Sequence, residues 1–415
     1  MSKIAVLGFG VVGSGTVELF YKNKAHIESK AGKAMDIKYI LDIRDFPGSP
    51  YEGKFVKDIN IILQDPEVDV VVEVMGGLKP AFDFVRSCLL AEKSVVTSNK
   101  ELVAAKGCDL LTLAKENNCN FFFEASVGGG IPIIRPLHHC LAANDITGIA
   151  GILNGTTNFI LTKMINEQMS FYDALGMAQT LGYAEKDPTA DVEGHDACRK
   201  ICILASLAFG HHVYPDKVHT EGISNITLED VEYAENWGGV IKLIGSVYKL
   251  DNGKILPMVR PAFVCKASPL STVDDVFNGI MVLGDAIDRV MFYGRGAGKM
   301  PTASAVVADV IVAAKSDGTS HSLTWGEGRN VDFIEDHLQA ETSMYVRVNA
   351  SDREEALQTI ESVFGKVLYL TRKGREKTEL AFITPALREQ LILEKLAALE
   401  KAGVQLLGKI RLLEN

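Results

Sequence analysis

The 415-residue chain contains no apolar run long enough to cross a membrane and no excess of positive charge. A membrane-spanning helix needs about 20 successive apolar residues, so we expect no membrane partner. The formal net charge is −10 and the pI is about 5.5. Nucleic acids and anionic membranes bind basic surfaces, so this charge argues against both as partners. Met1-Ser2-Lys3 leads directly into an apolar segment, so we expect no secretion signal.

The sequence also lacks the cysteine pattern of a secreted, disulfide-bonded protein. Its seven cysteines are odd in number, scattered, and mostly in apolar surroundings. This usage predicts a reduced, cytoplasmic protein without disulfides. Cys198 and Cys202 are four residues apart, but the further histidine and cysteine ligands of a zinc site do not follow. We therefore interpret both as core residues.

What the sequence does contain begins with a glycine motif. Gly8-Phe9-Gly10-Val11-Val12-Gly13 lies between the apolar run Ile4–Leu7 and a helical stretch through Phe20. In such a G-x-G-x-x-G motif the first glycine permits a tight turn and the second admits a diphosphate. The third lets helix and strand pack closely, and the helix N-terminus offers N–H groups to the phosphates. The motif predicts that these six residues bind NAD or NADP.

The following segments predict a parallel, doubly wound sheet. Apolar runs at 37–41, 68–74, 94–97 and 120–124 alternate with helical stretches near 80–92 and 101–117. We assign this Rossmann domain to residues 1–140, completed by a helix at about 300–315. Ligands of such sheets bind beyond the carboxyl ends of the strands. Gly76-Gly77 and Ser98-Asn99-Lys100 should therefore lie on the coenzyme side.

The choice of coenzyme stays open at this stage. Asp42 is suited to hold a ribose 2′-hydroxyl, which favours NAD, whereas Arg44 is suited to a 2′-phosphate, which favours NADP. Neither lies at the usual interval from the glycines, because residues 22–36 read as an inserted loop.

Three successive glycines, Gly128-Gly129-Gly130, follow the strand at 120–124. We interpret them as serving backbone freedom rather than packing, because they permit positive φ and turned carbonyls. With the carboxylate of Glu124, such carbonyls could enclose a cation. A flexible hinge between domains explains the glycines equally well, and the sequence does not decide between the two.

A carboxylate-rich segment, residues 182–200, is the strongest candidate for chemistry. Its first half is a Gly/Pro/Asp-rich loop and a helix begins at about Gly194. Asp196 and Lys200 then share one helix face. A carboxylate beside an ammonium can move a proton on an oxygen, although an ordinary surface salt bridge has the same spacing.

The rest of the chain predicts two further domains. Residues 141–299 read as an α+β domain with strands near 146–153, 241–249 and 256–264 and helices from 159, 171 and 194. A glycine-rich turn at 295–302 either closes over the coenzyme or simply precedes the apolar helix 303–314. After a linker at 316–340, residues 341–415 follow the βαββαβ order of a ferredoxin-like module.

At this point the sequence resembles the homoserine dehydrogenases over residues 1 to about 315. Besides the glycine motif, the similar segments are Ser98–Lys100, Glu124–Pro132, Asn154-Gly155-Thr156-Thr157-Asn158, Gly182-Tyr183 with 185–200, and Gly296-Ala297-Gly298 with Met300-Pro301-Thr302. The tail resembles an ACT regulatory module. Its first loop, Ala350-Ser351-Asp352-Arg353-Glu354-Glu355, departs from the Asp-x-Pro-Gly pattern of such modules, so threonine binding is left open.

The resemblance implies NAD(P)-dependent interconversion of L-aspartate 4-semialdehyde and L-homoserine, in threonine and methionine biosynthesis. It implies Lys200 as proton donor and acceptor, Asp196 as its orienting partner, and Lys100 near the nicotinamide. It also implies that Glu185 would receive the ammonium of the substrate. Asp191, Thr156 and Gly155 would lie close to the substrate as well. Gly182, Gly298 and Ser98 would border the coenzyme. Glu124 with the carbonyls of Val127, Gly129 and Ile131 would hold a sodium-like ion.

The resemblance further implies a homodimer, or a tetramer formed through the tail. Two other hypotheses stand beside it. One is a related dehydrogenase acting on another amino-acid-derived aldehyde. The other is a non-catalytic sensor that binds dinucleotide and an effector, for which the Asp196–Lys200 arrangement would be unnecessary.

Overall fold

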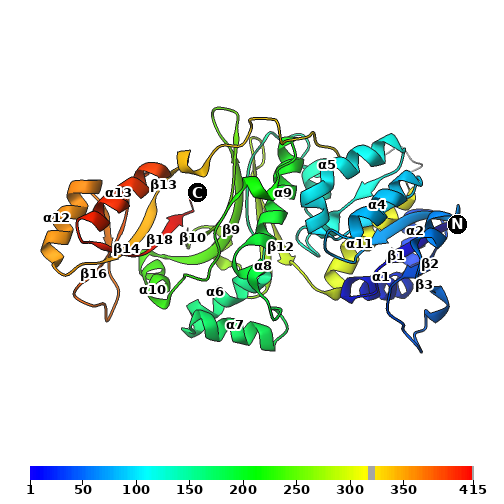
Figure 1. Cartoon of the computed structure of the whole chain (residues 1–415), viewed down its shortest axis with the longest axis horizontal. Coiled ribbons are helices and arrows are strands. Elements are labelled where there is room, and N and C mark those ends of the chain that lie inside the picture. The colour runs from blue at the N-terminus through cyan, green and yellow to red at the C-terminus, as the bar shows by residue number, and fades with distance from the viewer. Residues whose placement is uncertain (316–322, 414–415) are drawn as a thin grey trace.

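The computed structural model describes residues 1–315 and 323–413. Three regions follow one another along the long axis of the molecule, from the N-terminal sheet through a central sheet to the C-terminal helices (Figure 1). The start of the predicted linker, residues 316–322, lies outside the described residues. Within the described residues, no helix is both long and apolar enough to cross a membrane.

The first sheet is parallel, with the strand order β3-β2-β1-β4-β5-β6. This order confirms the predicted doubly wound architecture. Its strands are β1 (Ser2–Leu7), β2 (Met35–Leu41), β3 (Phe55–Val56), β4 (Val68–Glu73), β5 (Ser94–Thr97) and β6 (Phe121–Phe122). Its helices are α1 (Val11–Lys22), α2 (Lys24–Ala31), α3 (Ile59–Leu63), α4 (Ala81–Leu90), α5 (Lys100–Glu116) and α11 (Lys299–Lys315).

Helix α11 returns the chain to this first sheet after the whole central region. It packs on α1, α2 and β4, beside which it lies in Figure 1. The two helices α1 and α11 approach closely at Gly15, where an added Cβ would lie 2.9 Å from the Lys299 carbonyl oxygen. The position of α11 agrees with the helix predicted at about 300–315.

Two local predictions were wrong, and several elements were not predicted. Residues 22–36 are not an inserted loop, because helix α2 occupies most of them. The helix expected from residue 159 begins at Gly155, because the Asn154 side chain accepts a hydrogen bond from Thr157 N and caps it. The antiparallel hairpin β11–β12 and helix α10 were not predicted.

The second sheet is mixed and crosses the centre of the molecule. Its order is β12-β11-β7-β9-β10-β18-β14-β16-β15, with β8 beside β10. The central strands are β7 (Ile146–Ile152), β8 (His219–Thr220), β9 (Gly239–Lys249), β10 (Ile255–Cys265), β11 (Phe277–Gly284) and β12 (Asp288–Arg295). The helices of this region are α6 (Gly155–Glu167), α7 (Phe171–Thr180), α8 (Thr189–Val192), α9 (His195–Phe209) and α10 (Leu228–Trp237).

The C-terminal elements follow the predicted βαββαβ order. They are β14 (Met344–Asn349), α12 (Arg353–Phe364), β15 (Leu368–Leu370), β16 (Glu379–Ile383), α13 (Glu389–Lys401) and β18 (Gln405–Leu412), while β13 (Glu341–Thr342) pairs with β17 (Leu387–Arg388). Strand β18 pairs in parallel with β10, so these strands continue the central sheet rather than forming a separate one. The domain boundaries at 140, 299 and 340 stay predictions.

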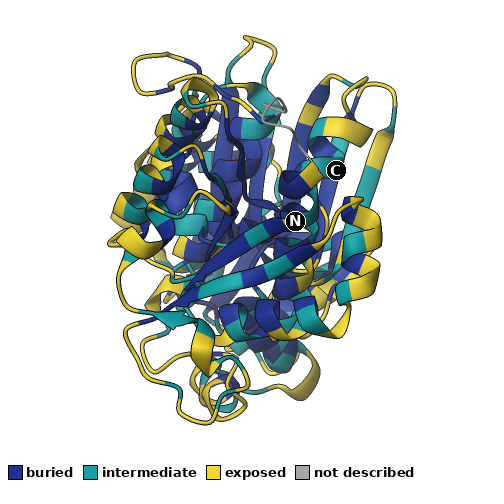
Figure 2. Ribbon diagram, turned by 90° about the vertical axis from the view of Figure 1, so that its right-hand side faces the viewer, coloured by how far each residue is buried: buried dark blue, intermediate teal, exposed yellow. Residues whose placement is uncertain are grey.

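Burial explains which segments form the first sheet. All but one of the β4 residues are buried, as expected for a parallel strand covered by helices on both faces. Figure 2 shows the strands largely buried, with exposed residues gathered on loops and outer helix faces. The buried apolar residues of the first sheet and of the central helices form one continuous cluster. The elements that flank the site are thus held by a shared core.

Candidate active site

The glycine motif forms a tight connection between β1 and α1. An added Cβ at Gly13 would lie 2.0 Å from the Gly8 carbonyl oxygen, so only glycine allows this packing. Gly8 has a φ of +97°, and Gly10 faces open space. Helix α1 begins at Val11 without a side-chain cap, which leaves its first N–H groups available to a phosphate. The geometry is that of a dinucleotide-binding turn.

This turn opens onto a cleft of about 440 Å³ at the carboxyl ends of β1, β4 and β5. The predicted coenzyme residues Val11, Val12, Ser98, Lys100 and Gly298 line it. The other lining residues are Val74, Met75, Gly76, Gly77, Asn99, Glu101, Ala125, Ser126, Gly129, Arg199, Lys200, Gly296, Ala297 and Thr302. The cleft therefore joins the first sheet to Lys200 of the central region.

The cleft wall is organised by Glu73, which the sequence analysis did not single out. Its carboxylate accepts hydrogen bonds from Met75 N at 2.8 Å and from Thr97 Oγ1 at 2.6 Å. Burial raises the pKa of this carboxyl group. Asn99 caps α5, accepting from Leu102 N at 3.0 Å, and also donates to the Gly77 carbonyl at 2.6 Å. These bonds fix the loops that follow β4 and β5.

Asp42 and Arg44, the candidates for recognising the ribose 2′ group of the coenzyme, bind each other. The Arg44 guanidinium donates from Nε and Nη2 to the two Asp42 carboxylate oxygens at 3.0 and 2.9 Å. Phe9 N of the glycine motif also donates to this carboxylate, at 2.8 Å. The Arg44 hydrogen bonds hold the pKa of Asp42 well below its usual range. Asp42 is thus an ionised, paired group at the end of β2.

Two lysines and two carboxylates meet beside the cleft. Lys200 Nζ donates to Asp196 Oδ2 at 2.6 Å and to the Leu153 carbonyl at 2.7 Å, and it is only 8% exposed. Lys100 Nζ lies 3.0 Å from the other Asp196 oxygen. Asp196 therefore lies between two ammonium groups that both reach the cleft. The prediction that Asp196 and Lys200 share a helix face is confirmed, and their burial excludes an ordinary surface salt bridge.

A second carboxylate, Asp191, joins this group through Asn154. The Asn154 side-chain nitrogen donates to Asp191 Oδ1 at 2.7 Å and to Asp196 Oδ2 at 2.9 Å. Burial alone would raise the pKa of Asp196, but the ammonium groups of Lys200 and Lys100 hold that pKa well below its usual range. Burial raises the pKa of Asp191, and the Asn154 hydrogen bond opposes this. Attraction to Asp196 raises the pKa of Lys100.

The other predicted substrate residues are placed differently. Thr156 Oγ1 donates to the Tyr183 carbonyl at 2.7 Å and ties α6 to the 182–188 loop. Gly155 lies close to the Val276 carbonyl, which an added Cβ would approach to 2.8 Å. Gly182 and Glu185 are exposed in the loop before α8 and do not line the cleft. The structure therefore groups Asp191 with the lysines but leaves Glu185 outside that group.

The Glu124 loop corrects one interpretation. Gly129 and Gly130 do serve packing, since added Cβ atoms would lie 2.4 Å from the Gly296 carbonyl oxygen and 2.7 Å from Pro301 Cβ. The Glu124 carboxylate accepts from the backbone N–H groups of Ile133, Ile134 and Arg135 at 2.7 to 2.9 Å. It thus binds the chain that follows the glycines, and the predicted cation ligands Val127, Gly129 and Ile131 can contribute only carbonyl oxygens.

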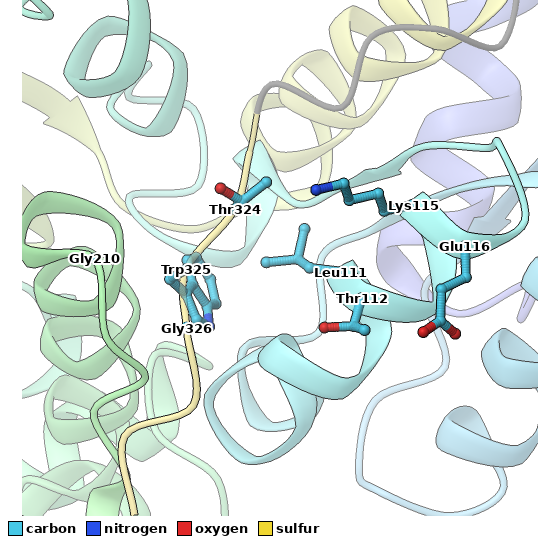
Figure 3. Close-up of a pocket in the computed structure, with 8 residues that line it drawn as sticks. All are labelled: Leu111, Thr112, Lys115, Glu116, Gly210, Thr324, Trp325 and Gly326. Carbon is cyan, nitrogen blue, oxygen red and sulfur yellow. The ribbon is translucent and has the colours of Figure 1, made fainter. Parts of the chain in front are cut away.

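A different cavity, of about 760 Å³, lies near the far end of α5 (Figure 3). Its lining residues are Leu111, Thr112, Lys115, Glu116, Gly210, Thr324, Trp325 and Gly326. None of these is a predicted site residue, and none lines the cleft beside the glycine motif. The predicted coenzyme residues thus line the smaller cleft and not this cavity.

Comparison with known proteins shows the family of the chain. Residues 8–124 match the family model for the homoserine dehydrogenase NAD-binding domain, and residues 132–311 match that for homoserine dehydrogenase. The homoserine dehydrogenase of Bacillus subtilis is 39% identical, over 92% of this chain and 91% of its own. The chain belongs to the homoserine dehydrogenase family. It is accordingly an NAD(P)-dependent oxidoreductase with homoserine dehydrogenase activity, which excludes the sensor hypothesis.

Solved structures of the family extend the likeness to the whole chain. The homoserine dehydrogenase of Thiobacillus denitrificans has a TM-score of 0.91 at 34% identity, covering 100% of this chain and 98% of its own. That of Staphylococcus aureus has a TM-score of 0.82 at 34% identity, covering 100% and 99%. A hyperthermophilic archaeal homoserine dehydrogenase mutant in complex with NADPH has a TM-score of 0.64 at 30% identity, covering 75% of this chain and 97% of its own.

Proposed function

We propose that Lys200 is the acid–base residue of the homoserine dehydrogenase reaction in this chain. That reaction interconverts L-aspartate 4-semialdehyde and L-homoserine. The observation that carries the proposal is the position of Lys200 Nζ, which lines the coenzyme cleft while bonded to Asp196 and to the Leu153 carbonyl. These two acceptors fix the ammonium at the border between the coenzyme cleft and the buried carboxylates.

The chemistry follows from this placement. The reduced nicotinamide supplies a hydride to the aldehyde carbon when bound. Negative charge then develops on the aldehyde oxygen, where the Lys200 ammonium stabilises it and donates one proton to complete the hydroxyl. Lys200 regains its proton from water. In the reverse direction neutral Lys200 accepts the hydroxyl proton. Lys100, which Asp196 keeps charged, adds a second positive charge near the reacting oxygen.

The amino-acid part of the substrate needs acidic and carbonyl groups. Asp191 and Glu185 receive its ammonium in our proposal, with Thr156 and Gly155 beside them. Asp191 is half-buried next to the lysine group, whereas Glu185 lies on an exposed loop and would have to meet the substrate from there. Both carboxylates favour a substrate that bears an ammonium over a simple aldehyde.

The paired state of Asp42 bears on the coenzyme. Because Arg44 neutralises its carboxylate, Asp42 presents no free negative charge to a 2′-phosphate, and the Arg44 side chain is 58% exposed at the surface. This pairing favours NADP over NAD. The related NADPH complex of the archaeal enzyme supports the same choice. The coenzyme would rest on the glycine motif, with Ser98 and Gly298 at its border. Gly182 lies outside the cleft and would have to meet the coenzyme from its exposed loop.

A sodium-like ion and a homodimer complete the proposal. With the Glu124 carboxylate engaged by backbone N–H groups, the ion would be held by the carbonyls of Val127, Gly129 and Ile131.

A dimer would use the central sheet, where β12 is an end strand and Tyr293 is largely exposed. A tetramer through the tail would use β15, because β18 is already paired with β10. Light scattering tests both. The free cysteines agree with a cytoplasmic protein.

The decisive experiment follows nicotinamide absorbance with L-homoserine and NAD⁺ or NADP⁺, then with aspartate semialdehyde and each reduced coenzyme. We expect turnover in both directions and a higher kcat/KM with NADP. Lys200→Ala should lower kcat at least about a hundredfold while coenzyme binding is retained. Lys200→Arg keeps the charge but donates a proton poorly, so it should be similarly impaired. Near-normal turnover of either variant would remove Lys200 from the proposed role.

A further inference from the structure

Asn154 occupies a junction between three helices. It follows β7, precedes α6, and its side chain reaches α8 and α9, which lie next to α6 in Figure 1. Its side-chain oxygen accepts from Thr157 N at 2.8 Å and from Thr157 Oγ1 at 3.0 Å. This capping bond fixes the orientation of the amide, because the oxygen must face α6. The nitrogen therefore faces the two carboxylates.

Both hydrogens of that nitrogen are used. One goes to Asp191 and the other to Asp196, so a single neutral group bridges two carboxylates. Asp196 has two ammonium partners of its own, Lys200 and Lys100. The Asp191 carboxylate accepts its hydrogen bond from Asn154. The two carboxylates thus depend unequally on this residue.

A hydrogen-bond donor shared by two neighbouring carboxylates favours the ionised form of both. We propose that Asn154 is a positioning residue that keeps Asp191 ionised beside Asp196, so that Asp191 can receive the ammonium of the amino-acid substrate. This inference rests on the proposed function, in which Asp191 binds that ammonium. It adds that the affinity for homoserine at neutral pH depends on a neutral side chain that does not touch the substrate.

The electrostatic environment of Asp191 sets the direction of the effect. Burial and the neighbouring Asp196 raise its pKa, while Asn154, Lys200 and Lys100 lower it. Removal of the Asn154 donor leaves only the lysines, which are already shared with Asp196. Asp191 should then take up a proton at a higher pH and lose its attraction for an ammonium.

Asn154→Asp isolates this role from the capping role. Aspartate caps a helix as well as asparagine does and has the same shape, so the bond from Thr157 N survives. The donor, however, is replaced by an oxygen of a third carboxylate. Asn154→Ser is the second variant, because serine still caps but can donate to only one carboxylate. Thr157→Val is the control, since it removes the hydroxyl bond to the cap and leaves the donor intact.

The measurement is kcat and KM for homoserine from about pH 6 to about pH 10, with coenzyme saturating. For Asn154→Asp we expect the acid limb of kcat/KM to move to higher pH by at least about one pH unit, so that kcat/KM falls about tenfold at pH values on that limb. Most of this loss should lie in KM for homoserine. Asn154→Ser should lie between this variant and the wild type, and Thr157→Val should keep the wild-type profile.

Failure of this inference differs from failure of the proposed function. If the wild type turns over and Lys200→Ala does not, but both Asn154 variants keep the wild-type acid limb and KM, Asn154 is only a helix cap. A lower melting temperature with an unmoved pH profile leads to the same conclusion. If Lys200→Ala is active, the proposed function itself fails.

Discussion

At the scale of single residues, Glu185 offers a test of substrate binding that is free of stability effects. Its side chain is exposed on the loop before α8, outside the buried lysine group. We expect Glu185→Gln to raise KM for homoserine about tenfold, as loss of one charge-assisted bond to an ammonium implies, with little change in kcat or melting temperature. Steady-state kinetics at saturating coenzyme measures both constants.

Asp187→Asn is the matched control for this prediction. Asp187 lies two residues away, is exposed, and its carboxylate bonds locally to Thr189. The variant removes the same charge from the same loop, so a general electrostatic effect of the loop would raise KM in both variants. Equal effects, or no effect of Glu185→Gln, would contradict a direct bond between Glu185 and the substrate.

Residue-scale predictions succeeded where partners are close in sequence. Asp196 and Lys200 are four positions apart on one helix, so their pairing follows from helix geometry alone. Asn154 reaches Asp191 and Asp196 across 37 and 42 positions. Glu73 and Thr97, similarly, meet because their strands are neighbours in the sheet. Only the folded arrangement of β4, β5, β7, α8 and α9 creates these contacts, so no local spacing signals them.

At the scale of elements, Arg135 joins helix α11 to the Glu124 loop. Its guanidinium lies 2.5 Å from Asp309 of α11 and 3.4 Å from Glu124, and both carboxylates are almost fully buried. Arg135→Met leaves these charges without their cation. We expect it to lower the free energy of unfolding by about 3 kcal/mol, the lower end for a broken buried pair, since Arg135 is partly exposed. Urea unfolding measures the loss.

The pH dependence and a second substitution check this interpretation. Burial raises the pKa of Asp309 to about 7, so in the folded protein it holds a proton at pH values where the unfolded chain has lost it. A protonated Asp309 needs no cation, so the loss in Arg135→Met should be smaller at pH 6 than at pH 8. Adding Asp309→Asn should restore part of the stability at pH 8. No recovery there would show that Arg135 acts through packing alone.

Elements were predictable where burial imposes a clear pattern. Strand β4 has four valines among its six residues, and all but one of the six are buried, because helices cover both faces of the first sheet. Helix α2 has few apolar residues, with only Ile27 and Ala31 buried, and its segment therefore resembled a loop. Strand β12 is an end strand in which no residue is buried, so its sequence shows no clear alternation of buried and exposed positions.

At the scale of the whole molecule, the sequence predicted the order of the three regions. It did not predict the contacts that join them. The βαββαβ tail was expected behind a linker, yet β18 pairs with β10 at only two positions, Ala262 with Arg411 and Phe263 with Leu412. Helix α10 covers the tail's sheet through Asp230, which accepts from Arg347 Nε at 3.0 Å. Contacts across such distances in sequence give no local signal. They join the tail to the sheet that carries Asn154.

Arg411 of β18 forms ion pairs at the junction between the tail and the central region. It donates to both Glu221 oxygens at 2.8 and 2.9 Å and to Glu389, whose side chain is fully buried. Arg411→Met leaves the buried Glu389 carboxylate without its cation. This should lower the free energy of unfolding by about 3 kcal/mol or more. We expect calorimetry to resolve an early melting transition of the tail, separate from that of the remaining chain. Lys409→Met, exposed on the same strand, should melt as the wild type does. A single unshifted transition in Arg411→Met would mean that packing of β18 on β10, rather than the buried ion pairs, holds the tail in place.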